Sequence, residues 1–393
     1  MRKVNKQSLQ KLKANTEYCE CTFSLNKDYS YKIQNSYFHN CNFENDVSFE
    51  KIKDCKFIDC SFSGKFELDL SKTRLKKIPD DVFDISSLTH LNLSRNKLTE
   101  LPAAIEKLSS LTHLYLANNQ LKSIPVEIGE LSSLTYLDLV NNKLTDVPAE
   151  IGKFSFLAYL DLASNQLENI PVEISGLTSL TYLGLGSNKL TTIPSEIGKI
   201  LSLAELNLEK NQLENIPSEI GKILSLAKLN LNNNNLTSIP AELGKLLFLA
   251  ELNLGSNKLT TVPVEIGRTS SITTLNLSKN ELTDLPEIGE NSSLTVLDLS
   301  KNNLTTISTR VKQFSSLIVL DLSNNKIESL PAEIGKLHAL TKLRLRNNKL
   351  ESMPAEISNL LSLTKMRMRG NPLSEKQQKL IKEYLPECNI KFK

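Results

Sequence analysis

Hydrophobic residues recur along most of the chain with a period of 23 positions, and this period decides which elements the sequence predicts. The repeated pattern is LxxLxLxxNxLxxIPxEIGKLSS. It begins in full at Leu88 and last at Leu363, giving thirteen units after one degenerate unit near Lys65 to Ser87. The ninth unit lacks one residue between Pro286 and Glu287, and we expect a loop to absorb this deletion.

Each position of the repeat has a predicted structural role. Leu91 and Leu93 alternate with polar residues, which predicts a short strand with both leucines on its buried face. Asn96 and its equivalents stand where the chain leaves the strand, and a buried amide left without hydrogen bonds there costs about 1–3 kcal/mol. We therefore expect a ladder of asparagines bonded to neighbouring backbone. Pro102 and the following E-I-G-K-L residues predict one short helical or 3-10 turn, and Ser308 replaces this proline in unit ten.

No single unit can bury its leucines, so neighbouring units must stack to create a core. The prediction is an elongated, curved α/β solenoid with a parallel concave sheet, short helical or 3-10 turns on the convex side, and caps at both ends. The repeat resembles the leucine-rich-repeat proteins of the 23-residue intracellular and bacterial type, similar to Ras-pathway and Scribble-like scaffolds. This resemblance covers about three quarters of the chain. It implies a horseshoe that usually holds a protein partner against its concave face.

The ends of the chain predict two caps around the solenoid. We expect a Cys/Phe-rich β-type cap at residues 1–64, the solenoid at 65–373, and a helix-strand cap at 374–393. In the first cap a C-x-F unit recurs, which resembles the pentapeptide repeats of square β-helices: Cys21-Thr-Phe23, Cys41-Asn-Phe43, Cys55-Lys-Phe57 and Cys60-Ser-Phe62. At the other end Ser374 and Gln377 have the spacing of a capping box.

Composition restricts the function further. The 47 Lys and Arg residues nearly balance the 44 Asp and Glu residues, so any basic surface must be local. A hydrophobic content of 40% excludes a disordered chain, and no apolar stretch approaches the roughly 18 residues of a membrane span. The first twenty residues hold no apolar run typical of a signal peptide, so we expect cytoplasmic localisation. No phosphate-binding loop or kinase signature occurs, so we predict no enzymatic activity and no cofactor.

Five of the six cysteines lie within the first 60 residues. In a reducing compartment these are expected to be thiols. A zinc site built from Cys19, Cys21, His39 and Cys41 is the alternative, but the C-x-C and H-x-C spacings depart from those of structural zinc sites. We therefore predict no metal.

The positions that vary between units carry the information about function. The third, fifth and seventh positions of each unit are expected to project from the concave sheet. One group of them, the aromatic zone, predicts a partner-binding site, since tyrosine offers a rigid contact with a polar tip. Gly184 and Gly186 leave a shallow space beside it. The alternative is that the rings only stack and stabilise the sheet. The aromatic zone comprises His90, His113, Tyr115, Tyr136, Asp138, Tyr159, Asp161 and Tyr182.

A second group of varying positions, the basic zone, forms a predicted two-by-three grid on adjacent strands. Like charges at this spacing repel, and a carboxylate or phosphate from an acidic ligand relieves the repulsion. The alternative is a solvated charged end. Glu205, Glu209 and Glu251 add an acidic patch between the two zones. The basic zone comprises Lys342, Arg344, Arg346, Lys365, Arg367 and Arg369.

The sequence therefore predicts a non-enzymatic scaffold that binds a protein or an extended peptide on its concave face. A catalytic use of His113 with Asp138 is not favoured, because the adjoining strands hold no serine or cysteine nucleophile. Two alternatives remain open. One is anion binding, of nucleic acid or a phosphorylated lipid, through the basic zone. The other is an exported effector that acts on host proteins. The oligomeric state stays open too.

Overall fold

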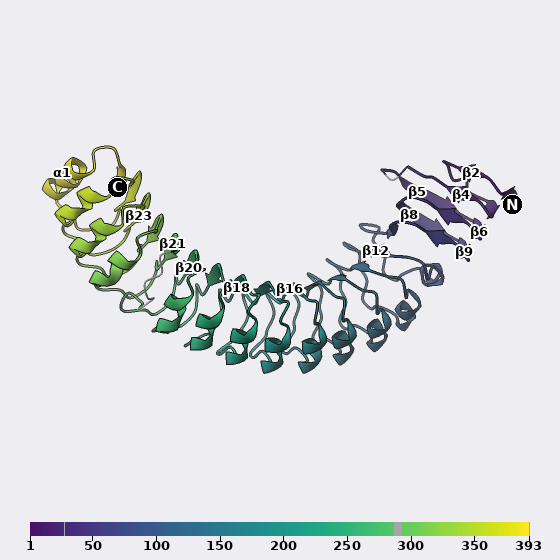
Figure 1. Ribbon diagram of the computed structural model, residues 1–393, viewed down its shortest axis with the longest axis horizontal. Helices are drawn as coiled ribbons and strands as arrows, with labels where there is room; N and C mark the ends of the chain where they lie inside the picture. The colour runs from purple at the N-terminus through teal and green to yellow at the C-terminus, as the bar shows by residue number, and fades with distance from the viewer. Residues whose placement is uncertain (27, 287–292, 393) are drawn as a thin grey trace. The chain divides into compact units, whose positions relative to one another are not determined.

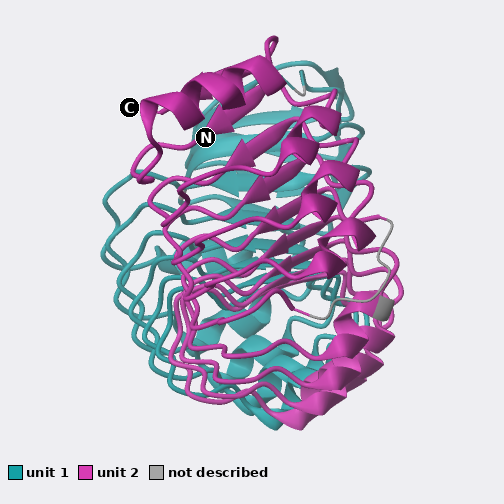
Figure 2. Ribbon diagram, turned by 90° about the vertical axis from the view of Figure 1, so that its left-hand side faces the viewer, with its two compact units in different colours: residues 1–189 teal, residues 190–393 magenta. Residues whose placement is uncertain are grey.

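The computed structural model describes residues 1–26, 28–286 and 293–392, and the chain divides into two compact units, Met1–Lys189 and Leu190–Lys393 (Figures 1 and 2). In each unit the backbone winds through stacked coils. Strands form a parallel sheet on one side, and short 3-10 turns lie on the opposite side. The loop that we expect to absorb the one-residue deletion after Pro286 lies outside the described residues.

The N-terminal part of the first unit is built from short strands in three parallel sheets. One sheet has the order β1-β3-β6-β9 and another the order β2-β4-β7-β10, while β5 and β8 continue into β11. The strands are β1 Arg2–Asn5, β2 Ser8–Leu9, β3 Thr16–Cys19, β4 Thr22–Phe23, β5 Ser30–Gln34, β6 Tyr37–His39, β7 Asn42–Phe43, β8 Val47–Lys53, β9 Lys56–Ile58, β10 Ser61–Phe62 and β11 Phe66–Asp69.

Aromatic rings fill the interior of this N-terminal part. Phe43 stacks between Phe23 and Phe62, with ring centroids 4.7 Å apart on both sides. Small buried residues complete the coils, and the Cys21 thiol donates to the carbonyl of Val4 at 3.4 Å. Cysteine suits such a position because it is compact and carries only a weak donor. None of the six cysteines, all of which lie within the described residues, forms a disulfide bond.

The 23-residue units form the coils that follow, and their strands pair in register. In the first compact unit, Met1–Lys189, these strands are β12 His90–Asn92, β13 His113–Tyr115, β14 Tyr136–Asp138, β15 Tyr159–Asp161 and β16 Tyr182–Gly184. In the second unit they are β17 Glu205–Asn207, β18 Lys228–Asn230, β19 Glu251–Asn253, β20 Thr274–Asn276, β21 Val296–Asp298, β22 Val319–Asp321, β23 Lys342–Arg344 and β24 Lys365–Arg367. Equivalent positions lie side by side, as in the pairing of His113 with Tyr136.

The return segments η1 to η12, which lie within the described residues, are 3-10 turns whose apolar side chains face the core. The turns of the first unit are η1 Asp80–Asp84, η2 Ala103–Lys107, η3 Val126–Glu130, η4 Ala149–Lys153 and η5 Val172–Gly176. Those of the second unit are η6 Ser195–Lys199, η7 Ser218–Lys222, η8 Ala241–Lys245, η9 Val264–Arg268, η10 Thr309–Gln313, η11 Ala332–Lys336 and η12 Ala355–Asn359. Proline precedes most of these turns. Before η10 it is replaced by Ser308, whose hydroxyl accepts the Arg310 N–H at 3.2 Å.

The predicted asparagine ladder is confirmed. The Asn119 amide donates to the carbonyls of Leu93 and Leu116, both at 3.0 Å, and its oxygen accepts the Leu98 N–H at 3.1 Å. Each asparagine thus bonds its own coil and the coil before it. The degenerate coil has Thr73 at this position, and the next coil's Asn96 accepts the Thr73 N–H at 3.1 Å. The buried leucines and this ladder together confirm a solenoid with a parallel sheet and 3-10 turns.

The C-terminal end matches the helix and strand expected from its pattern. Helix α1 spans Glu375–Tyr384, and the Ser374 hydroxyl accepts the Gln377 N–H at 3.3 Å. Strand β25, Asn389–Lys391, extends the sheet beside β24. Within the described ranges, no helix has the length and apolar character needed to cross a membrane.

Candidate functional site

The aromatic zone lies on the sheet face of the first unit, and its rings stack from strand to strand. The Tyr159 ring lies 4.3 Å from that of Tyr136 and 4.5 Å from that of Tyr182, with interplanar angles of 3° and 6°. His90 and His113 stack at 4.1 Å. The predicted stacking is therefore present. Because neighbours cover the ring faces, the ring edges and hydroxyl tips are the parts left to meet a partner.

The carboxylates of the aromatic zone are held by the protein itself. Asp138 and Asp161 lie opposite each other on β14 and β15. The Tyr159 and Tyr182 hydroxyls donate to Asp161 at 3.2 and 3.4 Å. Burial raises the pKa of Asp161, while these hydrogen bonds and one from the Ala163 N–H oppose the rise. The space expected at Gly184 is occupied, since a Cβ added there would lie 2.3 Å from the Asp161 carboxylate.

The two histidines of the zone are positioned by threonine hydroxyls. The Nδ1 atom of His113 lies 3.0 Å from the Thr112 hydroxyl, and that of His90 lies 2.9 Å from the Thr89 hydroxyl. Burial lowers the pKa of His90 to about 4 and also lowers the pKa of His113. Both rings are therefore neutral at neutral pH. The hydrogen bond of His113 to Thr112, rather than to Asp138, gives no support to an acid–base pair.

The predicted acidic patch, in the second unit, is partly neutralised. Lys228 places its ammonium 3.4 Å from Glu205 and 3.9 Å from Glu251. The Glu209 carboxylate lies 3.8 Å from Lys210. Sequence reasoning did not anticipate these pairs. The patch is therefore a ladder of alternating charges rather than a surface of one sign.

The basic zone, also in the second unit, is exposed on β23, β24 and the residues directly after them. Arg344 pairs with Asp321 at 3.1 Å, and this aspartate was missed by the sequence reasoning. Within the described part of the chain, the other five cations have no carboxylate within 4.0 Å. Close ion pairing within the described residues therefore neutralises only one of the six cations.

A hollow of about 360 Å³, which we call the basic hollow, adjoins the basic zone. It lies where two coils carry serine at the seventh position and the next coils carry arginine. The change from serine to arginine along the seventh-position column is the sequence signal that could have located it. Its lining residues are Ser300, Lys301, Asp321, Ser323, Asn324, Arg344, Arg346 and Arg367.

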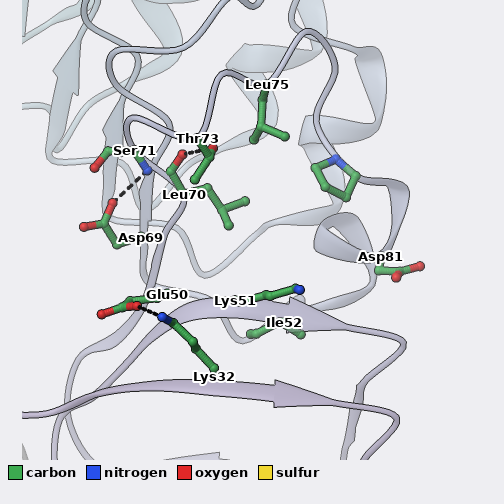
Figure 3. Close-up of a pocket in the computed structure, with 11 residues that line it drawn as sticks. Lys32, Glu50, Lys51, Ile52, Asp69, Leu70, Ser71, Thr73, Leu75 and Asp81 are labelled. Carbon is green, nitrogen blue, oxygen red and sulfur yellow. Dashed lines mark hydrogen bonds and ion pairs between the residues drawn. The ribbon is translucent and has the colours of Figure 1, made fainter.

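A larger hollow of about 710 Å³ lies in the first unit, at the junction between the N-terminal strands and the first coil (Figure 3). Strand β8 pairs with β11 as far as Phe49 and Leu68. Beyond this pair, β8 continues beside β5, while the coil turns away towards Leu75. The ion pair of Lys32 with Glu50, 3.0 Å long, lies at its rim. The hollow thus arises where two kinds of coil meet, and neither repeat pattern alone predicts it.

No metal site is formed by the residues that the structure describes. They contain no group of three or more His, Cys, Asp or Glu side chains arranged to hold a metal ion. The alternative zinc set of Cys19, Cys21, His39 and Cys41 is therefore not supported.

Comparisons with known proteins point to one family. A leucine-rich repeat model matches residues 67–121, 224–282, 292–350 and 315–373, and a leucine-rich repeat region model matches residues 126–216. No curated protein matches the chain.

Among solved structures, a leucine-rich-repeat protein of Leptospira interrogans is 37% identical, with a TM-score of 0.77, over 86% of this chain and 84% of that one. YopM, a leucine-rich effector protein from Yersinia pestis, is 31% identical over 78% and 77% of the two chains, with a TM-score of 0.61. The plant peptide hormone receptor RGFR1, solved in complex with RGF2, is 26% identical over 95% and 66%, with a TM-score of 0.61. The chain belongs to the leucine-rich-repeat proteins.

Proposed function

We propose that the chain is a non-enzymatic, cytoplasmic interaction module that binds a protein or peptide on its sheet face. Leucine-rich-repeat folds commonly serve as protein–protein interaction modules, and the similar receptor RGFR1 was solved with RGF2 bound. The proposal assigns the aromatic zone as the main anchor. Fold likeness alone does not locate a binding site, so the assignment rests on the residues of the aromatic zone themselves.

The observation that supports the aromatic zone is its row of rigid, half-buried rings. Stacking between Tyr136, Tyr159 and Tyr182 fixes the rings before a partner arrives. Little side-chain entropy is then lost on binding, which favours affinity. The exposed edges present hydroxyl groups beside apolar ring carbons, the combination found at interface anchors.

Affinity capture from the source cells with matched variants tests this proposal. Tyr136→Phe/Tyr159→Phe keeps the ring stack and removes two hydroxyl tips, so it is expected to reduce partner recovery at least severalfold without unfolding. Val126→Ala/Val172→Ala is the control, since both valines are about half exposed on 3-10 turns away from the sheet. The proposal fails if the sheet-face variant recovers the same partners as wild type, or if both variants lose them equally.

A second candidate function is binding of an acidic ligand through the basic zone, favoured by its five cations that have no carboxylate partner among the residues described. Binding of this kind weakens steeply with salt, because counterions are released when the ligand binds. Arg344→Glu/Arg367→Glu is expected to abolish it, and the tyrosine variant to leave it intact. Binding that tolerates a fourfold rise in salt contradicts this candidate.

The likeness to the effector YopM favours a further version of the proposal, in which the same module acts after export. Fractionation of the source cells distinguishes the two versions. Recovery from the cell interior supports the cytoplasmic version, and recovery from the surrounding medium supports the exported one.

A further inference from the structure

We infer that the basic hollow is a recognition site for a phosphorylated side chain of the protein partner. This inference rests on the proposed function, because it names a chemical feature of the partner. It concerns the second unit alone. The geometry, the charges and the size of the hollow support it in turn.

The geometry follows from which residues occupy one column of the repeat. At the seventh position, Ser300 and Ser323 are followed on the next two coils by Arg346 and Arg369. The two short side chains leave space on the sheet face, and the longer side chain of Arg346 lines one side of it. The ion pair with Asp321 draws the Arg344 guanidinium toward the preceding coil, at 3.1 Å. The hollow is thus lined by hydroxyl groups and bounded by guanidinium groups.

The charges in the hollow favour an anion of more than one charge. Lys301, Arg344, Arg346 and Arg367 line it together with the single carboxylate of Asp321. Lys301, Arg346 and Arg367 have no carboxylate within 4.0 Å among the residues described. Bringing such cations together is unfavourable, and an added anion relieves their repulsion. A phosphomonoester carries about −1.5 to −2 charges at pH 7 and three strong acceptor oxygens.

The size and the donors favour a phosphomonoester over other anions. A volume of about 360 Å³ admits a phosphoryl group together with the side chain that bears it. Guanidinium groups bind phosphate oxygens through two parallel hydrogen bonds, and serine hydroxyls can donate to the remaining oxygens. A carboxylate or a nucleic-acid diester brings one charge and fewer terminal oxygens, so it would leave cations unmatched.

The test is calorimetric titration of the full chain with O-phospho-L-serine, inorganic phosphate and L-serine. We expect one saturable site for the two phosphate compounds and no binding of L-serine. The affinity for O-phospho-L-serine should rise between pH 5 and pH 7.5, because the second proton of its phosphomonoester dissociates with a pKa of about 6. Similar affinities for O-phospho-L-serine and inorganic phosphate would show that the phosphoryl group alone is recognised. Tighter binding of O-phospho-L-serine would show that the serine part adds contacts.

Three variants separate a built site from general attraction to positive charge. Arg346→Ala removes a lining cation, and we expect about tenfold weaker binding of O-phospho-L-serine. Arg369→Ala is the matched control, because Arg369 belongs to the basic zone but does not line the hollow. Its affinity should stay within twofold of wild type. Ser300→Leu fills the hollow without changing any charge and should abolish binding, with circular dichroism confirming an unchanged fold.

Several results would overturn the inference. These are equal losses in Arg346→Ala and Arg369→Ala, retained binding in a folded Ser300→Leu variant, or no response to either phosphate compound. Binding to vesicles containing phosphatidylinositol phosphate, without any response to O-phospho-L-serine, would replace the protein partner with a membrane. If a partner is captured through the aromatic zone irrespective of phosphatase treatment, the inference fails and the proposed function stands. If the chain binds phosphate but no partner is captured through the sheet face, the proposed function fails and the basic hollow remains a phosphate site.

Discussion

The aromatic zone and the basic zone occupy equivalent positions of the repeat but differ in how far the protein satisfies them. In the aromatic zone the Tyr159 ring stacks 4.3 and 4.5 Å from its two tyrosine neighbours, and Asp161 is bonded by two tyrosine hydroxyls. In the basic zone only Arg344 has a carboxylate partner in the described part of the chain. The first zone therefore stabilises the fold before any partner binds, whereas the second gains most from a ligand. Variants in the two zones should differ accordingly.

The largest expected difference comes from removing a central ring. Tyr159→Ala loses two stacking contacts and one hydrogen bond to Asp161, so we expect unfolding to require about 2–4 kcal/mol less free energy. Lys365→Ala, at the same position of its unit, should change stability by less than about 0.5 kcal/mol. Urea denaturation followed by circular dichroism measures both. Equal effects would remove the contrast between the zones.

A smaller effect is expected from crowding the Asp161 carboxylate. In Gly184→Ala the new methyl group would overlap this carboxylate and force it away from the hydroxyls of Tyr159 and Tyr182. We expect a loss of about 1–2 kcal/mol, the range for a disturbed buried polar contact. Gly255→Ala in the second unit is a comparison variant, because the atoms nearest its new methyl group lie at 2.8 Å or more and therefore need a smaller displacement than the Asp161 carboxylate does at Gly184. A stable Gly184→Ala protein would show that Asp161 can relocate freely.

The pH dependence of stability sharpens the comparison further. The folded protein lowers the pKa of His90 to about 4, so between about pH 6.5 and pH 4 the unfolded state binds more protons. Stability from this group is complete above pH 6.5 and is lost as pH falls through that window. Because solvent screens this partly exposed ring, we expect the free energy of unfolding to fall by only about 1 kcal/mol across the window. Thermal melts of wild type and His90→Gln should converge at low pH, and a constant difference would contradict this assignment.

The smallest expected effect is a gain in stability from removing a cation. Arg346→Ala should leave the protein equally stable or stabilise it by up to about 0.5 kcal/mol at low salt, since it relieves repulsion. The gain should vanish at high salt, where exposed charges are screened. Melts at two salt concentrations measure it. A clear loss of stability would mean that Arg346 has an internal partner.

The parts of the molecule that sequence predicted are those fixed by short-range periodicity. The strand leucines, the asparagine ladder and the column from His90 to Tyr182 follow from position within the unit, because every coil repeats the same backbone. The Asp321–Arg344 pair was missed because the rotamer of a long side chain decides which neighbour its charged end reaches, and the periodicity does not specify that rotamer. The hollow beside Ile52 and Leu75 was missed because it depends on how two different coils diverge after Phe49.

The N-terminal cysteines show an intermediate case. Their C-x-F spacing indicated interior positions, and Cys21, Cys41 and Cys55 are buried whereas Cys60 is only partly buried. The same spacing left a zinc alternative open, since a pattern of ligands does not state whether their side chains converge. In three dimensions, the described residues contain no group of three or more His, Cys, Asp or Glu side chains arranged to hold a metal ion.

The asparagine ladder also bears on how such a chain can change in length over evolution. Each asparagine bonds the coil before its own, so duplication or loss of a whole unit restores the same bonds at the new junction. Thr73 marks the exception, since its coil follows a different kind of backbone and its side chain bonds the Leu70 carbonyl of the same coil. Unequal recombination between gene segments can therefore add units C-terminal to the Thr73 coil. Each added unit extends the sheet face that is available to partners and leaves both end segments unchanged.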